Sequence, residues 1–547
     1  MRHLPFGFCF SLALCAISSC DIKRPPSPEQ LAGGLSLKLG SVELTLQPGG
    51  GASVQMKVTT SAELNGPVAF ELVPNDGADL PGGLGYSFEP EQVLVPVGQT
   101  VVATLQLAAD PSISLSDFGF VVKARSGDKL ASMPLLVRIA PFGPTWDRQM
   151  GTSGTDTLSA VAADSAGNWY VAVNSTGSID GKPNAGDYDG YLLSYTSTGT
   201  LRFAAQVASD KTDYLTGVAV DKDDAVYVSG YTFGTLPGQV SFGRTDGFVA
   251  RFTANGALVW STQLGSAEID KLNSLAVGSD GNLTAVGTTE GNYATFKNAG
   301  LGDVWIVRLS QAGLPVSSLQ LGSDQNDTAT TVTIEPTRNI SFIAGNTAGT
   351  LPGANTLGLQ DAFLLSMNAD AKLGWVRQTG SSGTDEITTS VLDDAGNVWI
   401  GGNTRGTLPG QISMGGQDCL MLQFSGDGTR LNARQFGTSY VDGIAALAWF
   451  EKNLYSVGST KGGFVGQTAF GGYDMFFSKH QQNGQTVWLN QFGTDQADNA
   501  AGLGVTKNTL FLAGSTFGTF GGQVPLGGSD GYLLSMRLYP SSPQKAD

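Results

Sequence analysis

Two evenly spaced series of aspartates are the residues of this 547-residue chain that could do chemistry. Each series recurs at intervals of 56 to 58 residues, and the second follows the first by 32 to 34 residues. Grouped carboxylates bind hard cations such as calcium, and a pair of them can hydrolyse a glycosidic bond. The first series is Asp156, Asp213, Asp270, Asp327, Asp385, Asp442 and Asp498; the second is Asp189, Asp246, Asp303, Asp361, Asp418, Asp474 and Asp530.

The same aspartates also suit a purely structural role. A carboxylate that follows a turn rich in Gly, Ser and Thr, such as residues 151–155 before Asp156, can accept backbone N–H bonds from that turn. Uniformity favours this role, because every copy needs its loop held whereas a ligand site needs few positions. We therefore expect the fourteen aspartates to be structural and expect no cofactor, with a calcium-binding rim as the alternative.

The elements that must position these carboxylates belong to a sevenfold repeat. A glutamine lies seven residues before each aspartate of the first series. Each copy contains four short strand-like segments, as at 215–220, 398–402, 247–252 and 258–264. Four strands in a repeat of this length are typical of a β-propeller blade. We expect an all-β chain with seven blades over 145–540, and expect these glutamines to be edge-strand partners: Gln149, Gln206, Gln263, Gln320, Gln378, Gln435 and Gln491.

The repeat carries a family resemblance. Residues 488–494 leading to Asp498, and residues 394–399 running into Gly402-Asn-Thr404, resemble the seven-bladed β-propeller (SBBP-type) repeat of bacterial surface and exported proteins. The resemblance covers all seven copies. It implies the fold and an exported location, and it assigns no chemistry.

The phase of the repeat predicts how the ring closes. The region opens with a lone strand of the fourth, outermost type at 145–150 and stops after a strand of the third type at 532–537. The strand of Trp146 should therefore complete the blade begun by residues 498–540, which protects both edges. Residues 541–547 are expected to be a tail. Because strands one and three run in the same direction, both aspartate series should lie on one face of the propeller.

Side chains that differ between the copies at one position of an otherwise constant loop are candidates for ligand binding. The pattern Gly-x-Thr-x-Gly follows the second strand in six copies, and Val173-Asn-Ser-Thr-Gly177 replaces it in the first. Such a ring could bind a protein or a glycan, with the phenylalanines as apolar anchors and Arg, Lys and Glu as polar contacts. The alternative is that these loop tips vary because nothing constrains them. The last variable position holds Thr176, Phe233, Glu290, Ala348, Arg405, Lys461 and Phe517.

The N-terminus indicates export. Residues 1–19 have a positive start and a short apolar run, as in a secretory signal. Ile17-Ser-Ser-Cys20 resembles the bacterial lipobox, which implies a diacylated Cys20, a tether over 20–35 and a membrane anchor in the cell envelope or at the cell surface. The alternative is an ordinary signal peptide with an incidental Cys20. Cys419 is expected to be an isolated thiol.

A separate β domain is expected between the tether and the propeller. Alternating segments at 53–58, 68–73 and 101–107, with turn-forming residues between them, predict about seven strands over 36–141. This pattern is typical of an immunoglobulin-like β-sandwich, for which we expect a spacer role.

Charge and composition exclude several classes of function. The net charge of −16 argues against a nucleic-acid partner. One histidine, His480, would remain after the leader, which excludes a Ser-His-Asp triad or a multi-histidine metal site. We expect a non-catalytic envelope lipoprotein whose propeller binds a protein or glycan. The alternatives are a polysaccharide-active enzyme with a carboxylate pair near the central channel and a purely structural envelope protein.

Overall fold

The computed structural model describes residues 34–46, 51–64, 66–75, 79–110, 116–139, 143–506, 509–520, 523 and 525–537. The expected signal peptide, Cys20, nearly all of the tether and the tail lie outside these residues. Every element in the described ranges is a β-strand, which confirms the all-β prediction. No helix in them is long and apolar enough to span a bilayer. The chain divides into two compact units near Pro144.

The N-terminal unit contains two sheets around one hydrophobic core. The first sheet has the order β1 (Leu35–Leu39), β3 (Gly51–Thr60), β7 (Thr100–Ala109) and β5 (Leu84–Glu89). The second has the order β2 (Glu43–Leu46), β9 (Lys129–Ile139), β8 (Ser116–Ser126), β4 (Val68–Pro74) and β6 (Gln92–Val93).

Residues of both sheets fill the core between them, including the fully buried Met56 and Leu105 of the first sheet and Phe120 and Val137 of the second. The described residues form nine strands where about seven were expected. The additional strands are short: β2 has four residues and β6 has two, too few to show a clear alternation in the sequence.

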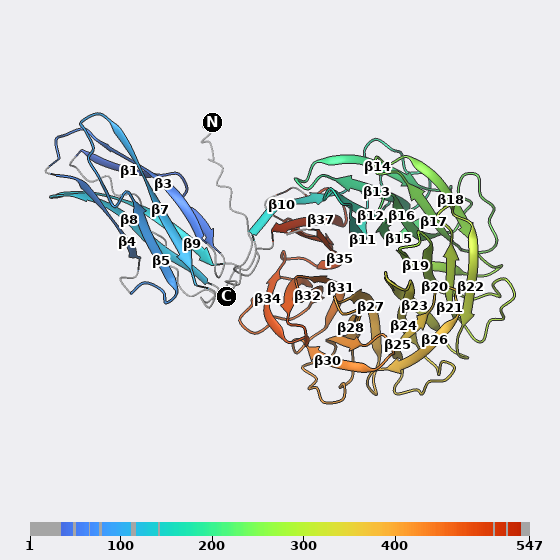
Figure 1. Cartoon of the computed structure of the whole chain (residues 1–547). Helices are drawn as coiled ribbons and strands as arrows, with labels where there is room; N and C mark the ends of the chain where they lie inside the picture. The colour runs from blue at the N-terminus through green and yellow to red at the C-terminus, as the bar shows by residue number, and fades with distance from the viewer. Residues whose placement is uncertain are drawn as a thin grey trace, which may run out of the picture. The chain divides into compact units, whose positions relative to one another are not determined.

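The second unit is a β-propeller of seven four-stranded antiparallel sheets that follow one another around a ring (Figure 1). Blades one to three are β11 (Asp156–Ala163), β12 (Trp169–Ser175), β13 (Asp189–Tyr195), β14 (Leu201–Val207); β15 (Asp213–Val220), β16 (Val226–Thr232), β17 (Asp246–Phe252), β18 (Leu258–Leu264); and β19 (Asp270–Val277), β20 (Leu283–Thr289), β21 (Asp303–Leu309), β22 (Pro315–Leu321). Blades four to six are β23 (Asp327–Glu335), β24 (Ile340–Thr347), β25 (Asp361–Met367), β26 (Leu373–Thr379); β27 (Asp385–Leu392), β28 (Val398–Thr404), β29 (Asp418–Phe424), β30 (Arg430–Phe436); and β31 (Asp442–Phe450), β32 (Asn453–Thr460), β33 (Asp474–His480), β34 (Thr486–Phe492).

The seventh blade joins the two ends of the propeller. Its order is β10 (Gly143–Met150), β37 (Asp530–Arg537), β36 (Thr509–Thr516) and β35 (Asp498–Thr506). The predicted closing strand is thereby confirmed. Trp146 of β10 also reaches the first blade, where its Nε1 donates to the carbonyl of Ser197 at 2.9 Å.

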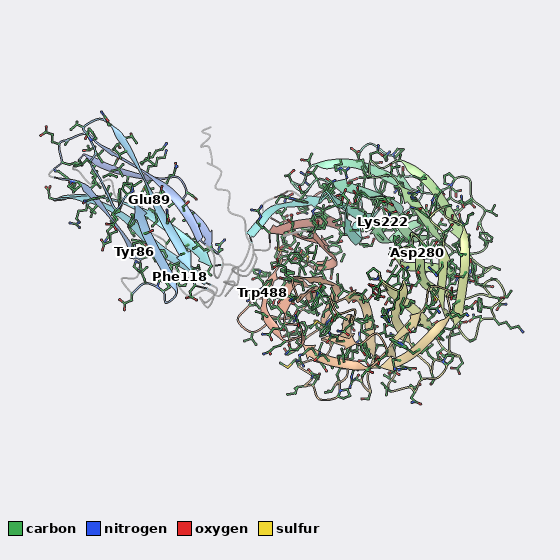
Figure 2. The ribbon with its side chains drawn as sticks, viewed as in Figure 1. Tyr86, Glu89, Phe118, Lys222, Asp280 and Trp488 are labelled. Atoms are coloured by element: carbon green, nitrogen blue, oxygen red, sulfur yellow. The ribbon has the colours of Figure 1, made fainter. Side chains whose placement is uncertain are left out.

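The blades pack through apolar faces. The second and third strands of a blade, such as β12 and β13, are buried along their whole length. Trp169 of the first blade stacks on Phe511 of the seventh, with ring centroids 4.5 Å apart. Burying each such ring contributes about 1.5–3 kcal/mol. The first strands line the axis and the fourth strands form the rim, where Figure 2 labels Trp488 of β34.

Candidate functional site

Strand register brings both aspartate series to one face of the propeller. In blade two, Asp213 of β15 lies opposite Thr232 of β16, which lies opposite Asp246 of β17. Blades one and three to six repeat this register, and in the seventh blade Asp498 lies opposite Thr516. We call this end of the propeller the aspartate face.

Each aspartate of the first series caps the loop that enters its blade. Asp327 accepts hydrogen bonds from the backbone N of Ser323 at 2.6 Å and from its Oγ at 2.8 Å. The backbone bond recurs in the other six blades. Its donors are Thr152, Ser209, Ser266, Ser381, Thr438 and Thr494, for Asp156, Asp213, Asp270, Asp385, Asp442 and Asp498 respectively.

Each aspartate of the second series binds a glutamine. In blade two, Gln263 Nε2 donates to Asp246 Oδ2 at 2.7 Å and to the carbonyl of Gly234 at 3.0 Å. Its Oε1 accepts from the backbone N of Leu236 at 3.0 Å. The glutamine therefore ties the loop after the second strand to the carboxylate. The glutamine also lies on the edge strand, as expected, where Gln263 of β18 pairs with Phe248 of β17; its side chain in addition bonds a loop of its own blade.

The two series meet in pairs between neighbouring blades. A Cβ on Gly265 would lie 2.3 Å from Asp246 Oδ1 and 3.0 Å from Asp270 Oδ2, so only glycine fits between them. Burial raises the pKa of the Asp270 carboxyl, hydrogen bonds from Thr289 and Ser266 oppose this, and the charge of Asp246 adds to the increase. No group of three or more His, Cys, Asp or Glu residues is placed to hold a metal in the described ranges.

The candidate binding ring occupies equivalent positions in all seven blades. The backbone N of Phe233 donates to the carbonyl of Thr212 at 3.0 Å, and the same bond is present at the other six positions. Six of the seven side chains are exposed, with Phe233 at 49% and Phe517 at 55%. Thr176 is half-buried, and its Oγ1 accepts from the backbone N of Thr155 at 2.8 Å.

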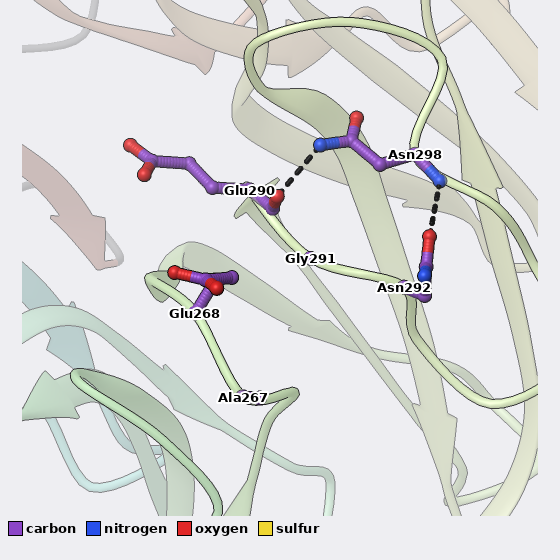
Figure 3. A pocket seen from close by; sticks show the side chains of 6 residues that line it. All are labelled: Ala267, Glu268, Glu290, Gly291, Asn292 and Asn298. Carbon is purple, nitrogen blue, oxygen red and sulfur yellow. Dashed lines mark hydrogen bonds between the residues drawn. The ribbon is translucent and has the colours of Figure 1, made fainter.

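A hollow of about 430 Å³ lies beside Glu290 on this face (Figure 3). Glu268, Glu290, Asn292 and Asn298 contribute its polar side chains. Asn298 Nδ2 donates to the carbonyl of Glu290 at 2.6 Å, and its backbone N donates to Asn292 Oδ1 at 2.8 Å. Figure 3 shows the Glu268 and Glu290 carboxylates on the same side of this loop. The hollow offers acceptors and amides to a polar ligand.

The central channel is lined by residues of the first strands. A hollow of about 230 Å³ on the axis contains the residue three positions after each first-series aspartate: Ser159, Thr216, Asn273, Thr330, Thr388, Ala445 and Ala501. Thr216 Oγ1 donates to the carbonyl of Leu272 in the next blade at 2.7 Å. Corresponding bonds start from Ser159, Asn273, Thr330 and Thr388.

This ring was not predicted from the sequence, although a hydroxyl or amide three residues after the aspartate in five copies was the available signal. None of the residues that line the axial hollow is Asp or Glu. The carboxylate pair that the enzyme alternative placed near the central channel is not among them, because both aspartate series lie at the strand starts on the aspartate face.

The other residues with chemical potential are packed in the core. His480 Nε2 lies 2.9 Å from Ser478 Oγ and 3.1 Å from Ser456 Oγ, and its Nδ1 lies 3.2 Å from Thr486 Oγ1. Burial lowers the pKa of His480 to about 3, so the ring is neutral at physiological pH. Cys419 is a buried free thiol whose pKa burial raises.

The chain is similar to a curated regulatory protein and matches no family model. It is 25% identical over 431 residues to the regulatory protein FlaEY of Caulobacter vibrioides, a match that covers 73% of this chain and 40% of FlaEY. The chain thus spans less than half the length of that relative.

Solved structures show only weak similarity. A quinoprotein alcohol dehydrogenase-like protein from Bacteroides thetaiotaomicron is 12% identical, with a TM-score of 0.26 over 72% of this chain and 94% of that one. The cobalt-substituted apocarotenoid oxygenase of Synechocystis is 11% identical, with a TM-score of 0.31 over 82% of this chain and 87% of that one. Neither similarity bears on function.

Proposed function

We propose that the chain is an exported lipoprotein of the bacterial cell envelope whose propeller binds a protein or glycan on the aspartate face without catalysing a reaction. One observation carries this proposal. A frame of identical hydrogen bonds presents seven chemically different side chains at equivalent positions, and six of them are exposed.

The frame supports binding because it removes flexibility from the loops. Each loop is fixed at two points. The backbone N of its ring residue donates to the residue that precedes the first strand, and the glutamine bonds a loop carbonyl and the second-series aspartate. A ligand that binds a rigid surface loses less free energy to ordering that surface. The exposed Phe233 and Phe517 are suited to be the apolar anchors, since aromatic residues dominate binding hot spots.

The N-terminal part completes the proposal. Cys20 carries the lipid, residues 20–35 are the tether, and the two-sheet unit over 36–141 is an immunoglobulin-like spacer. The two sheets around one core support a sandwich of this type. The repeat is of the SBBP type, which the glycine-rich frame and the seven Gln–Asp pairs support.

A polysaccharide-active enzyme is the second candidate. The observation that favours it is the presence of Glu268 and Glu290 in one hollow, since two carboxylates can divide the roles of acid and base or nucleophile. Turnover of an envelope polysaccharide that is abolished by Glu290→Gln, with binding retained, would support this candidate over the non-catalytic one.

The test uses the full chain. Wild type and Phe233→Ala/Phe517→Ala are immobilised and exposed to envelope extract, and the retained material is quantified. We expect the double variant to retain at least tenfold less. Leu314→Ala/Leu431→Ala is the matched control, because these leucines are exposed at the opposite ends of the strands. Equal retention by all three proteins would contradict the proposal.

The lipid anchor is tested by a separate variant, Cys20→Ser, which should lose its association with the membrane.

A further inference from the structure

Four aromatic side chains form a continuous strip on the aspartate face of the first two blades. Tyr188 immediately precedes β13, Tyr214 lies in β15, Tyr231 lies in β16, and Phe233 follows β16 in the candidate ring. Successive ring centroids are 5.1 Å, 5.2 Å and 6.2 Å apart. The three tyrosines are half-buried, so each ring is held by its surroundings and still reaches solvent.

The repeat shows that the propeller does not need these tyrosines. The position of Tyr231 holds Asn, Thr or Ser in the other six blades. In blade one this residue is Asn174, whose Oδ1 accepts from the backbone N of Leu215 at 2.7 Å and whose Nδ2 donates to the Leu215 carbonyl at 3.0 Å. Asn346, Thr288, Ser459 and Ser515 also bond the backbone of the next blade.

Tyr231 therefore replaces a residue type that joins blades. Tyr214 is likewise an exception, since its position holds Thr157, Lys271, Thr328, Glu386, Gly443 and Asn499 in the other blades. At this junction an aromatic side chain stands where other blades have a residue that bonds the next blade. A ligand-binding role explains the aromatic residue, because the smaller polar residues are sufficient for the fold.

The strip borders polar groups of the third blade. Lys271 Nζ lies 4.9 Å from the centroid of Tyr231. Lys271 is three residues after Glu268, which lines the hollow together with Glu290, Asn292 and Asn298. Burial raises the pKa values of Tyr214 and Tyr231, so both hydroxyls keep their protons at neutral pH and can donate. The strip thus contacts Lys271, which is three residues along the chain from the hollow with its carboxylates and amides.

We infer that this strip and hollow bind an uncharged glycan chain, whose sugar rings stack on Tyr188, Tyr214, Tyr231 and Phe233 and whose hydroxyls reach Glu268, Glu290 and the neighbouring amides. The C–H face of a sugar ring is complementary to the negative face of an aromatic ring. Sugar hydroxyls both donate and accept, which suits a mixed lining of carboxylates and amides.

The net charge of the chain, −16, selects against acidic ligands. At the site itself Asp187, Glu268 and Glu290 are negative, and Lys271 and Arg244, whose Nη1 lies 3.9 Å from Glu268 Oε2, are positive. A polyanionic glycan would bring like charges together, whereas an uncharged one would not. The inference rests on the proposed binding function of the aspartate face and specifies its ligand class.

The test is affinity electrophoresis of the full chain in native gels cast with hydroxyethylcellulose, laminarin or, as a polyanion, alginate. The variant is Tyr214→Thr/Tyr231→Asn, which installs residues that other blades use at these positions and should therefore fold. The control is Tyr440→Ala, because Tyr440 is 56% exposed and is the blade-six counterpart of Glu268 on the same face.

We expect at least one uncharged polysaccharide to retard wild type and Tyr440→Ala equally, and to bind Tyr214→Thr/Tyr231→Asn at least tenfold more weakly at unchanged Tm. Three outcomes would overturn the inference: equal retardation of the double variant, retardation by alginate alone, or no retardation of wild type by any gel. If Phe233→Ala/Phe517→Ala still loses retention of envelope material in such a case, the proposed function stands and the glycan inference fails.

Discussion

Gln149 Nε2 donates a hydrogen bond to Asp530 Oδ2 at 2.7 Å, although the two residues are 381 positions apart. In the other six blades the corresponding Gln–Asp partners are 17 positions apart. The same bond that ties a loop in every blade therefore also ties the two ends of the propeller in the seventh.

Replacing this glutamine should open the ring more readily than replacing its counterparts. Gln149→Met leaves Asp530 Oδ2 short of one donor and leaves the backbone N of Phe520 and the carbonyl of Gly518 without their partner. We expect a loss of about 2 kcal/mol or more in the free energy of unfolding. Urea unfolding of the variant and the wild type measures this loss.

Gln378→Met in blade four is the matched control, because it removes the same three bonds within one blade. Gln378→Met should lower the free energy of unfolding by less than Gln149→Met, because Gln378 does not hold the two ends of the propeller together. Equal losses in the two variants would show that the closing blade is held independently of Gln149.

His480 makes stability depend on pH. Its pKa is about 3 in the folded protein and about 6.5 in an unfolded chain, so the unfolded state takes up the proton first. Its contribution to stability is present above pH ~6.5 and is lost as the pH falls toward 3, by up to about 1.4 kcal/mol per pH unit. His480→Gln should show a flatter decline between pH 6.5 and 4 in urea unfolding.

The buried aspartates act in the opposite direction. Burial raises the pKa of six of them, so their contribution is largest at low pH and is lost as the pH rises through the raised pKa; they are Asp213, Asp270, Asp327, Asp385, Asp442 and Asp498. This contribution is common to wild type and His480→Gln and cancels in the difference between them. Parallel pH profiles of the two proteins would contradict the assignment to His480.

Removal of calcium should leave the propeller unchanged. Asp327 Oδ2 is occupied by two protein donors, and Asp246 Oδ2 accepts from Gln263 and from the backbone N of Phe242. We expect the Tm to be the same in EDTA and in millimolar calcium. Asp246 Oδ1 is buried and has no protein donor in the described residues, so a calcium ion bound to this oxygen would raise the Tm. A higher Tm in calcium would favour the cation-binding rim.

The repeat could be predicted from the sequence, whereas the side-chain contacts that join its copies could not. The spacing of the aspartates and the unpaired strand of Trp146 predicted the blades and their closure, since both depend on order along the chain. The contacts of Gln263 depend on where a loop folds back. The tyrosine strip combines residues of blades one and two at non-equivalent positions; an alignment of the copies marks Tyr214 and Tyr231 as exceptions but does not show that their rings lie together.

The axial ring of hydrogen bonds offers a test by gain of stability. Thr388 Oγ1 donates to the carbonyl of Ile444 at 2.6 Å, whereas Ala445 and Ala501 have no donor at the equivalent positions. Ala445→Thr should place a hydroxyl toward the carbonyl of Ala500, because the register shift at this point of the first strand recurs in both blades. We expect a gain of about 0.5–1.5 kcal/mol in the free energy of unfolding. Thr388→Ala should lose a similar amount, and a loss of stability in Ala445→Thr would mean that the axis has no room for the added atoms.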